Sequence, residues 1–222
     1  EQLCGSADRS VDVVRDRDCR PWLWEADIEY PESADSSSAL RSARLVVRDG
    51  GAVKLWVNLD ADGKLPDGME VVVSSDISLG SGSSNSVTTA ASVDTREKVL
   101  EYATPNVKPH IFAKHTVAIC WAMAGRCRGN GPMLIWEASA VATLFRDEIL
   151  RLGYERCWKR MSKEATRRPE KSELLGWFQD SETKLALLLE YATAIYEGEF
   201  CERSHRTIEE CRSNLAEAHC VD

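Results

Sequence analysis

The residues best equipped for chemistry lie near the end of the sequence, where three cysteines and two histidines fall within residues 201–220. Cysteine and histidine at this density predict either a zinc site or part of a disulfide framework. A capping-box pattern at Thr207 predicts a helix with Cys211 on its apolar face. His205 and His219 would then lie at opposite ends of that helix and could not converge on a metal with Cys211. The spacing therefore favours disulfides over a metal site.

The chain contains eight cysteines, an even number, and none of them forms a C-x-x-C pair. Widely spaced, even-numbered cysteines in an acidic chain predict disulfides, and hence an extracellular protein that is secreted or surface-anchored. The alternative is a cytosolic protein with scattered buried thiols, because free cysteine packs as a small hydrophobic residue. The candidates for pairing are Cys4, Cys19, Cys120, Cys127, Cys157, Cys201, Cys211 and Cys220.

A second candidate for metal binding is the stretch NLDADGKLPDGME. Asn58, Asp60 and Asp62 occupy the first, third and fifth positions of a calcium-loop pattern, and Gly63 follows at the sixth. The pattern then fails, since Met69 stands at the twelfth position, where a glutamate is required. The alternative interpretation is a polar turn between strands, rich in Asp and Gly because these residues tolerate turn geometry. We predict no cofactor.

A basic stretch over residues 156–171 is followed by a strongly acidic one. As a helix, the basic stretch could dock an acidic protein, a sulfated glycan or a membrane surface. The alternative is an ordinary solvated face. The side chains that we select for binding are Arg160, Lys163, Arg167 and Arg168.

Trp56 adds an aromatic candidate to this binding surface. It alternates with Val53, Leu55 and Val57 between two polar neighbours, so it would be exposed if that strand were covered on one face only. An exposed Trp on a strand is typical of an interface anchor. A sheet covered on both faces would bury it instead.

Catalytic motifs are absent from the sequence. There is no G-x-S-x-G, no phosphate loop and no dinucleotide fingerprint. Paired carboxylates for hydrolysis cannot be recognised without the fold, because their separation is spatial. These observations lean against an enzyme.

The predicted elements begin with strands. Residues 21–30 alternate strictly between apolar and polar, which is typical of a half-buried strand. Residues 39–59 read as a hairpin with its turn at Asp49–Gly51, and residues 68–77 as a further strand. The Ser- and Gly-rich residues 78–92 predict a mobile loop.

The later elements are assigned from changes in period. Residues 94–103 read as a helix that begins at a capping pattern, and residues 108–123 as a long strand. A strand followed by a helix is predicted over residues 133–145. Residues 145–165 and 172–196 then read as helices, followed by the capped C-terminal helix.

These elements predict an α+β fold, with a mainly antiparallel sheet packed against about three C-terminal helices and stabilised by disulfides. We expect one domain over residues 1–222, mainly β over 1–139 and helical over 140–222. The net charge of -8 argues against nucleic acid as a partner, and no apolar run approaches the ~20 residues of a membrane span.

The function that fits best is a secreted or cell-surface interaction protein, such as a surface antigen, adhesin, effector or decoy. Its partner would be a protein or an acidic glycan. The alternatives are a small secreted carboxylate-dependent hydrolase and a small-ligand carrier.

Overall fold

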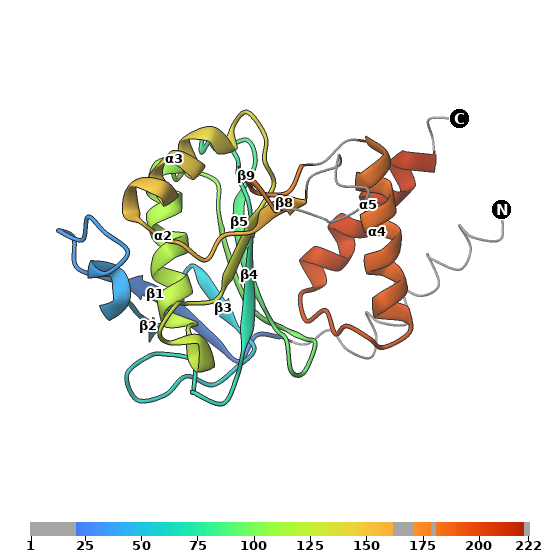
Figure 1. Cartoon of the computed structure of the whole chain (residues 1–222). Coiled ribbons are helices and arrows are strands. Elements are labelled where there is room, and N and C mark those ends of the chain that lie inside the picture. Colours follow the sequence, from blue (N-terminus) through green and yellow to red (C-terminus); the bar gives the residue numbers. More distant parts are fainter. Residues whose placement is uncertain (1–20, 162–170, 179–180, 220–222) are drawn as a thin grey trace. The chain divides into compact units, whose positions relative to one another are not determined.

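The computed structural model describes residues 21–161, 171–178 and 181–219 (Figure 1). The chain forms two compact units, each of which is considered by itself. The sheet unit comprises residues 23–94 and 99–178, and the helical unit comprises residues 1–22, 95–98 and 179–222.

The sheet unit is built on a seven-stranded sheet with the strand order β2-β1-β3-β6-β5-β4-β7. The strands are β1 (Trp24–Glu29), β2 (Arg44–Val47), β3 (Val53–Leu55), β4 (Val71–Asp76), β5 (Ser86–Ser92), β6 (Lys98–Thr104) and β7 (Met133–Trp136). Strand β7 runs parallel to β4, whereas β1–β2, β1–β3, β3–β6 and β4–β5 are antiparallel. The α+β class is confirmed, with a mixed sheet.

The predicted hairpin over residues 39–59 is wrong in its pairing. Strands β2 and β3 do not pair with each other, because β1 lies between them and pairs with both. The turn itself forms where expected, with the Gly51 N–H donating to the Arg48 carbonyl. A Cβ at Gly51 would lie only 2.5 Å from the backbone of Ala26, so glycine allows the connection to pass close to β1.

Helices α2 (Pro109–Ala122) and α3 (Ala142–Leu152) cover one face of the sheet (Figure 1). Between them and β7 lies an aromatic cluster, in which Phe145 contacts Phe112 at 6.0 Å and Trp136 at 5.7 Å between ring centroids. The predicted strand over residues 108–123 is therefore wrong. Helix α2 is buried on most of its surface, so its sequence lacks the polar stripe that marks a helix. The strand and helix predicted over residues 133–145 are confirmed as β7 and α3.

The region between β4 and α2 also differs from the prediction. Residues 86–92 form β5 rather than part of a mobile loop. Residues 98–104 form β6, so the helix predicted from Asp94 is wrong. Leu100 and Tyr102 of β6 belong to the core, which shows that packing against α2 overrides local helix propensity.

The single helix predicted over residues 145–165 ends early. Gly153 adopts φ 73° at the end of α3, and its N–H caps that helix. The chain continues as β8 (Lys159–Met161) and β9 (Lys171–Leu175), which form a two-stranded antiparallel sheet. The predicted basic helix over residues 156–171 therefore does not form in its described parts.

The helical unit contains α4 (Ser181–Tyr196) and α5 (His205–His219). The predicted C-terminal helix is confirmed, with Ile208 and Cys211 buried. It starts at His205, earlier than predicted. The hydroxyl of Ser204, directly before the helix, accepts the Thr207 N–H at 3.4 Å. A buried ion pair joins Lys98 to Glu202, with Nζ and Oε1 3.3 Å apart. Within the described residues, no helix has both the length and the apolar character to cross a bilayer.

The expected disulfide stabilisation is wrong for the described part of the chain. No disulfide joins any two of the described cysteines, and Cys120, Cys127, Cys157 and Cys211 carry free thiols. Burial raises the pKa of Cys157 to about 12, so this thiol stays protonated. These cysteines behave as the buried hydrophobic residues of the alternative interpretation. Cys4, Cys19 and Cys220 lie outside the described residues.

Candidate active site

Two acidic residues stand at the ends of the neighbouring strands β4 and β7. The parallel register pairs Ser74 with Ile135 and Ser75 with Trp136. Continuing this register by one residue places Asp76 beside Glu137. Neighbouring strands lie about 4.8 Å apart, and residues in register point to the same face, so the two carboxylates are neighbours on one face of the sheet.

This face is the one opposite to α2 and α3. Along β4, Val73 and Ser75 are buried on the helix side, whereas Ser74 and Asp76 are exposed. Along β7, Leu134 and Trp136 are buried and Glu137 is half-buried. The buried neighbours of both carboxylates fix the two strand ends to the core.

The order of the strands in the sheet also points to the carboxyl ends of β4 and β7 as the position of a site. From β4 the chain passes to β5 and β6 on one side, then crosses through α2 to β7 on the other side of β4. Ligands in open α/β sheets bind beyond the carboxyl ends of strands at such a change of direction. Asp76 and Glu137 lie at these carboxyl ends.

The loop after Asp76 is held in a defined conformation by serine hydroxyls. Ser78 Oγ donates to the Ser84 carbonyl at 3.0 Å, and Ser86 Oγ accepts the Ser78 N–H at 3.0 Å. Gly80 has φ 63°, and a Cβ there would lie 2.1 Å from the Val107 carbonyl oxygen. Small residues in this loop thus permit a tight and closely packed turn beside the carboxylates.

Buried hydroxyls anchor the sheet beneath the site. Ser75 Oγ lies 2.9 Å from Thr88 Oγ1, which lies 3.0 Å from Thr116 Oγ1 on α2. This chain of hydrogen bonds joins β4, β5 and α2. Buried hydroxyl groups that are fully paired make the local geometry specific, and here they fix the strand that ends in Asp76.

The backbone on the other side of Glu137 is held by a neighbouring segment. The Trp177 N–H donates to the Trp136 carbonyl, and the Ala138 N–H donates to the Trp177 carbonyl, both at 2.7 Å. Gly176 allows this approach, since a Cβ there would lie 2.8 Å from Trp136 Nε1. The end of β7 is therefore hydrogen-bonded on both sides, to β4 and to the segment around Trp177.

The chemistry of this pair fits a hard divalent cation. Magnesium prefers oxygen ligands and is commonly held by one or two carboxylates, with water and substrate phosphate completing its coordination. Asp76 and Glu137 supply two such carboxylates. Among the described residues, no group of three or more His, Cys, Asp or Glu side chains is arranged to hold a metal.

The side chains selected from the sequence lie elsewhere. Trp56 is half-buried beside β3, and its N–H donates to the Val99 carbonyl. Arg160 lies on β8 and donates to the carbonyls of Leu175 and Gly176, with its guanidinium 5.6 Å from the Phe178 ring centroid. The remaining three, Lys163, Arg167 and Arg168, lie outside the described residues.

The calcium-like loop is organised by its own hydrogen bonds. Asp60 Oδ1 accepts the N–H groups of Asp62 and Lys64 at 3.0 and 2.9 Å, as in an Asx turn. Asn58 Oδ1 accepts the indole N–H of Trp24 at 3.0 Å. The structure thus gives these side chains contacts within the protein.

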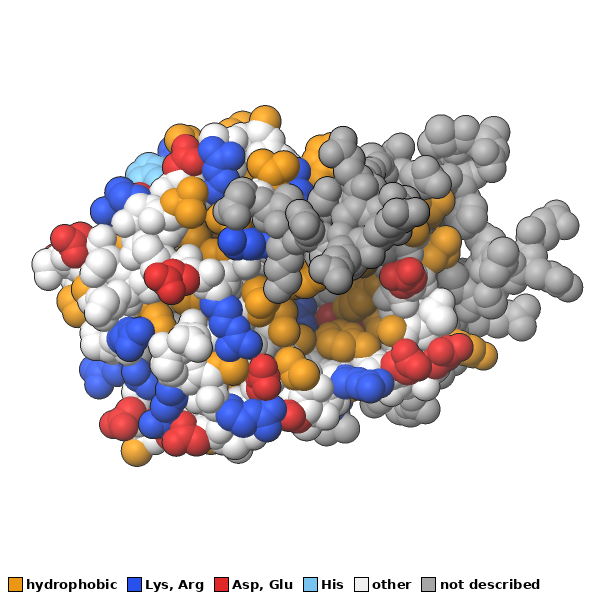
Figure 2. Space-filling view, in the orientation of Figure 1, with side chains coloured by type: hydrophobic (Ala, Val, Ile, Leu, Met, Phe, Trp, Pro, Cys, Tyr) orange, Lys and Arg blue, Asp and Glu red, His pale blue; other side chains and the backbone are white. Residues whose placement is uncertain are grey.

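Charged side chains elsewhere on the sheet unit are mixed in sign. Figure 2 shows acidic and basic groups interspersed over the described part of the visible face rather than gathered by sign. At the amino end of β4, Arg126 binds both Glu70 and Asp94, at 2.9 and 3.1 Å. Such pairs neutralise carboxylates on the sheet's loops.

Solved structures with a similar fold are known. No family model matches the chain, and no curated protein matches its sequence. Among solved structures, the chain is similar to the large terminase nuclease from thermophilic phage G20c with bound magnesium. The two share 12% identity and a TM-score of 0.52, covering 82% of this chain and 81% of that one. The same nuclease with bound cobalt matches at 11% identity and a TM-score of 0.51, covering 74% and 71%. At this identity the likeness shows a shared fold.

These findings correct the function expected from the sequence. The described cysteines form no disulfide, which removes the basis for a secreted or surface-anchored, extracellular protein. The fold is shared with a nuclease, which contradicts the expected secreted or cell-surface interaction protein. The prediction that nucleic acid is not a partner was also wrong. It rested on the net charge of the whole chain, which does not describe a local site. At such a site a cation can bridge protein carboxylates and a phosphate group.

Sequence reasoning missed Asp76 and Glu137. Each ends an apolar run, VVVSSD or MLIWE, and a loop of small residues follows. This shared pattern was the available signal. Their proximity depends on the pairing of two strands separated by a crossover helix, which the sequence does not reveal.

Proposed function

We propose that this chain is a nuclease that hydrolyses phosphodiester bonds of DNA with a divalent metal ion. The observation that carries the proposal is the register of β4 and β7, which ends at Ser75 and Trp136, directly before Asp76 and Glu137, at the switch point of the sheet. The shared fold with a nuclease that binds magnesium and cobalt supports it.

Asp76 and Glu137 would hold the metal. When bound, a divalent cation supplies charge stabilisation to the phosphoryl oxygens and lowers the pKa of an attacking water. The two carboxylates neutralise the cation and fix its position relative to the sheet. The Ser75–Thr88–Thr116 hydroxyl chain joins the end of β4 to β5 and α2, and the backbone contacts of Trp177 hold the end of β7. This rigidity keeps the ligand oxygens in place during the reaction.

The test is cleavage of linear double-stranded DNA by the purified chain in magnesium or manganese, with EDTA as the metal-free arm. We expect metal-dependent cleavage by the wild type, and a loss of about 100-fold or more in Asp76→Asn. Asp35→Asn, an exposed carboxylate elsewhere on the sheet unit, is the matched control and should cleave normally.

A parallel arm with single-stranded RNA of the same length tests the substrate class. Cleavage of DNA in preference to RNA supports the proposal as stated. Metal-independent cleavage, or equal activity in wild type and Asp76→Asn, would contradict it.

A further inference from the structure

A cavity with several hydrogen-bond donors lies in the sheet unit, close to the amino end of β7. Gly129 and Asn130 of its lining precede that strand, whereas Glu137 follows the strand's carboxyl end. The cavity has a volume of about 630 Å³, within the range of small-molecule sites. Its polar lining includes Ser36, Ser37, Ser38, Arg41, Trp121 and Arg156.

The Arg41 guanidinium is held in this lining without a carboxylate. Arg41 belongs to a short 3₁₀ helix, η1 (Ala39–Ser42). Its Cζ lies 4.7 Å from the centroid of the Trp121 ring, and its Nη2 donates to the Gly129 carbonyl at 3.2 Å. Among the described residues, it forms no ion pair with Asp or Glu. A guanidinium has five N–H donors, so most donors of Arg41 remain available to a ligand.

A second guanidinium is held by the same loop. Arg156 Nη1 donates to the Gly131 carbonyl at 2.9 Å, two residues along the chain from the carbonyl that holds Arg41. Arg156 also lies 3.7 Å from Glu70, but that carboxylate has a closer partner in Arg126 at 2.9 Å. Like charges that neutral carbonyls hold near one another repel, and an anion close to both relieves this repulsion.

The serines of the lining leave hydroxyl protons available for a ligand. Ser37 Oγ accepts the Trp121 indole N–H at 3.0 Å, and Ser36 Oγ accepts the Ala39 N–H at 3.3 Å. The Ser38 hydroxyl forms no hydrogen bond within the described part of the chain. A serine hydroxyl has one O–H donor in addition to its acceptor lone pairs. The lining is therefore richer in unused donors than in acceptors.

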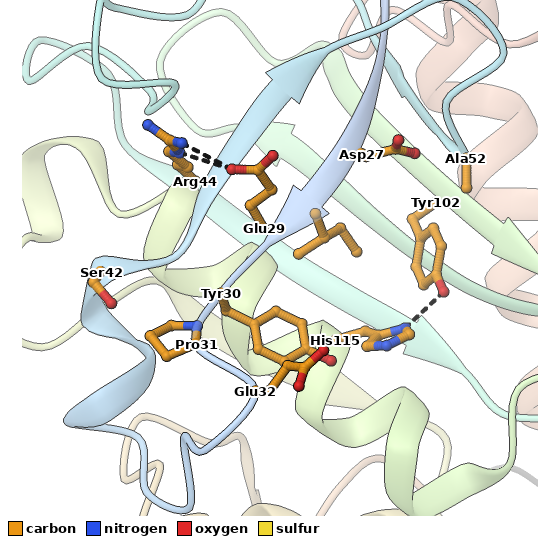
Figure 3. A pocket seen from close by; sticks show the side chains of 11 residues that line it. Asp27, Glu29, Tyr30, Pro31, Glu32, Ser42, Arg44, Ala52, Tyr102 and His115 are labelled. Atoms are coloured by element: carbon orange, nitrogen blue, oxygen red, sulfur yellow. Dashed lines mark hydrogen bonds and ion pairs between the residues drawn. The ribbon is translucent and has the colours of Figure 1, made fainter.

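The charges of the described lining are also unbalanced. It carries two guanidiniums and one carboxylate, that of Glu155, which is exposed and forms no ion pair with the described residues. The cavity in Figure 3 differs, because its Glu29 is bound by Arg44 at 2.9 Å and its Asp27 by Arg48 at 3.2 Å. An excess of positive charge and of donors indicates an anionic ligand for the cavity at Arg41.

We propose that this cavity binds a phosphate group, free or esterified, with Arg41 and Arg156 supplying charge and the hydroxyls of Ser37 and Ser38 supplying neutral donors. Guanidinium groups suit this ligand because their N–H groups can donate in pairs to phosphate oxygens. The inference does not rest on the proposed nuclease function, since it involves neither Asp76 nor Glu137.

The test is isothermal titration calorimetry with inorganic phosphate and, separately, with AMP, at constant ionic strength and in the presence of EDTA. EDTA removes divalent cations, so that phosphate cannot bind through a metal at the proposed active site. We expect saturable binding, and the tighter of the two compounds distinguishes a phosphate ester from free phosphate. Arg41→Gln should weaken binding by about tenfold or more. Arg146→Gln, which changes an exposed arginine outside the cavity, should leave it unchanged.

A second variant separates a role in binding from a role in folding. Glu155→Gln removes the carboxylate of the described lining and should tighten phosphate binding by about twofold to fivefold. A merely structural role for this part of the chain would not produce tighter binding. Weaker binding by a folded Glu155→Gln variant would contradict the proposal.

Two further results would overturn the inference. The first is the absence of saturable binding of either compound by a chain that circular dichroism shows to be folded. The second is equal weakening by Arg41→Gln and Arg146→Gln, which would indicate non-specific attraction to surface charge. DNA cleavage by Arg41→Gln should equal that of the wild type, so this inference and the nuclease proposal are tested separately.

Discussion

The two ends of β4 are both acidic, but their surroundings differ. At the amino end, Glu70 and Asp94 share Arg126, at 2.9 and 3.1 Å. The hydrogen bond from Arg126 lowers the pKa of Glu70. The pKa of Asp94 is lowered mainly by the hydrogen bond from the Glu70 backbone N–H, with Arg126 adding to it. Each carboxylate here has a cationic partner that supports the fold.

At the carboxyl end, the sheet register sets a second acidic residue beside the first. Asp76 and Glu137 each come directly after the last pair of the parallel register, Ser75 and Trp136, and like charges on neighbouring strands are unfavourable for stability. The difference teaches that the same residue type has two roles along one strand. Carboxylates opposite a base hold the sheet together, whereas we propose that the carboxylates of Asp76 and Glu137 hold a cation.

The largest expected effect is on catalysis at the Asp76–Glu137 pair. Asp76→Asn and Glu137→Gln should each reduce metal-dependent DNA cleavage by about 100-fold or more. The double variant should be little worse than either single one, because residues that act as a unit are not additive. Single-turnover cleavage rates measure this. Additive losses would contradict a shared metal site.

A smaller effect is expected for a carboxylate that supports the fold on β1. Glu25 accepts from Lys54 Nζ and from the Gly50 N–H, and both ion-pair side chains are largely buried. Glu25→Ala should lower the free energy of unfolding by about 1–2 kcal/mol, without changing the cleavage rate per folded molecule. Urea denaturation and the cleavage assay together check this. Loss of cleavage in a folded Glu25→Ala variant would contradict the assignment of Glu25 to stability and of the Asp76–Glu137 pair to catalysis.

The amino end of β4 should show its role through pH. The pKa values of Glu70 and Asp94 are lowered in the folded state, so their contribution to stability is present above the unfolded pKa of about 4. It is lost as pH falls through the lower folded values. Arg126→Gln should therefore lower the melting temperature at pH 7, and the difference from wild type should shrink below about pH 4. A difference that stays constant across this range would contradict the assignment.

The smallest effect is expected for the exposed pair of Asp27 and Arg48, whose side chains are 40% and 74% exposed. Arg48→Ala should change the free energy of unfolding by less than about 0.5 kcal/mol, because water and salt screen such pairs. Urea denaturation at low and high salt measures it. A loss as large as that of Glu25→Ala would show that exposure does not separate these two pairs.

The sequence predicted those elements whose pattern is local. Strict alternation located β1, and the apolar run before Asp76 located β4. Helix α2 was taken for a strand because most of its sides are buried, so no polar stripe marks it. The position of β1 between β2 and β3 was missed. The turn at Gly50 is compatible with direct pairing of β2 with β3, and equally with a third strand that lies between them.

The candidate site could not be predicted for a physical reason. Asp76 and Glu137 are sixty-one positions apart (137 less 76), and only the crossover through α2 sets their strands in parallel. Cysteine number misled the functional argument, because the count does not distinguish disulfides from buried thiols. Cys120 is fully buried in the core, where a thiol serves as a hydrophobic side chain.

The most direct measurement of the central claim is the position of a bound divalent cation. Crystals of the chain grown or soaked with manganese can be examined by anomalous diffraction. We predict an anomalous peak within coordination distance of carboxylate oxygens of both Asp76 and Glu137, absent in Asp76→Asn crystals under the same conditions. Manganese bound only elsewhere, with Asp76 and Glu137 well ordered and without a cation, would contradict the account.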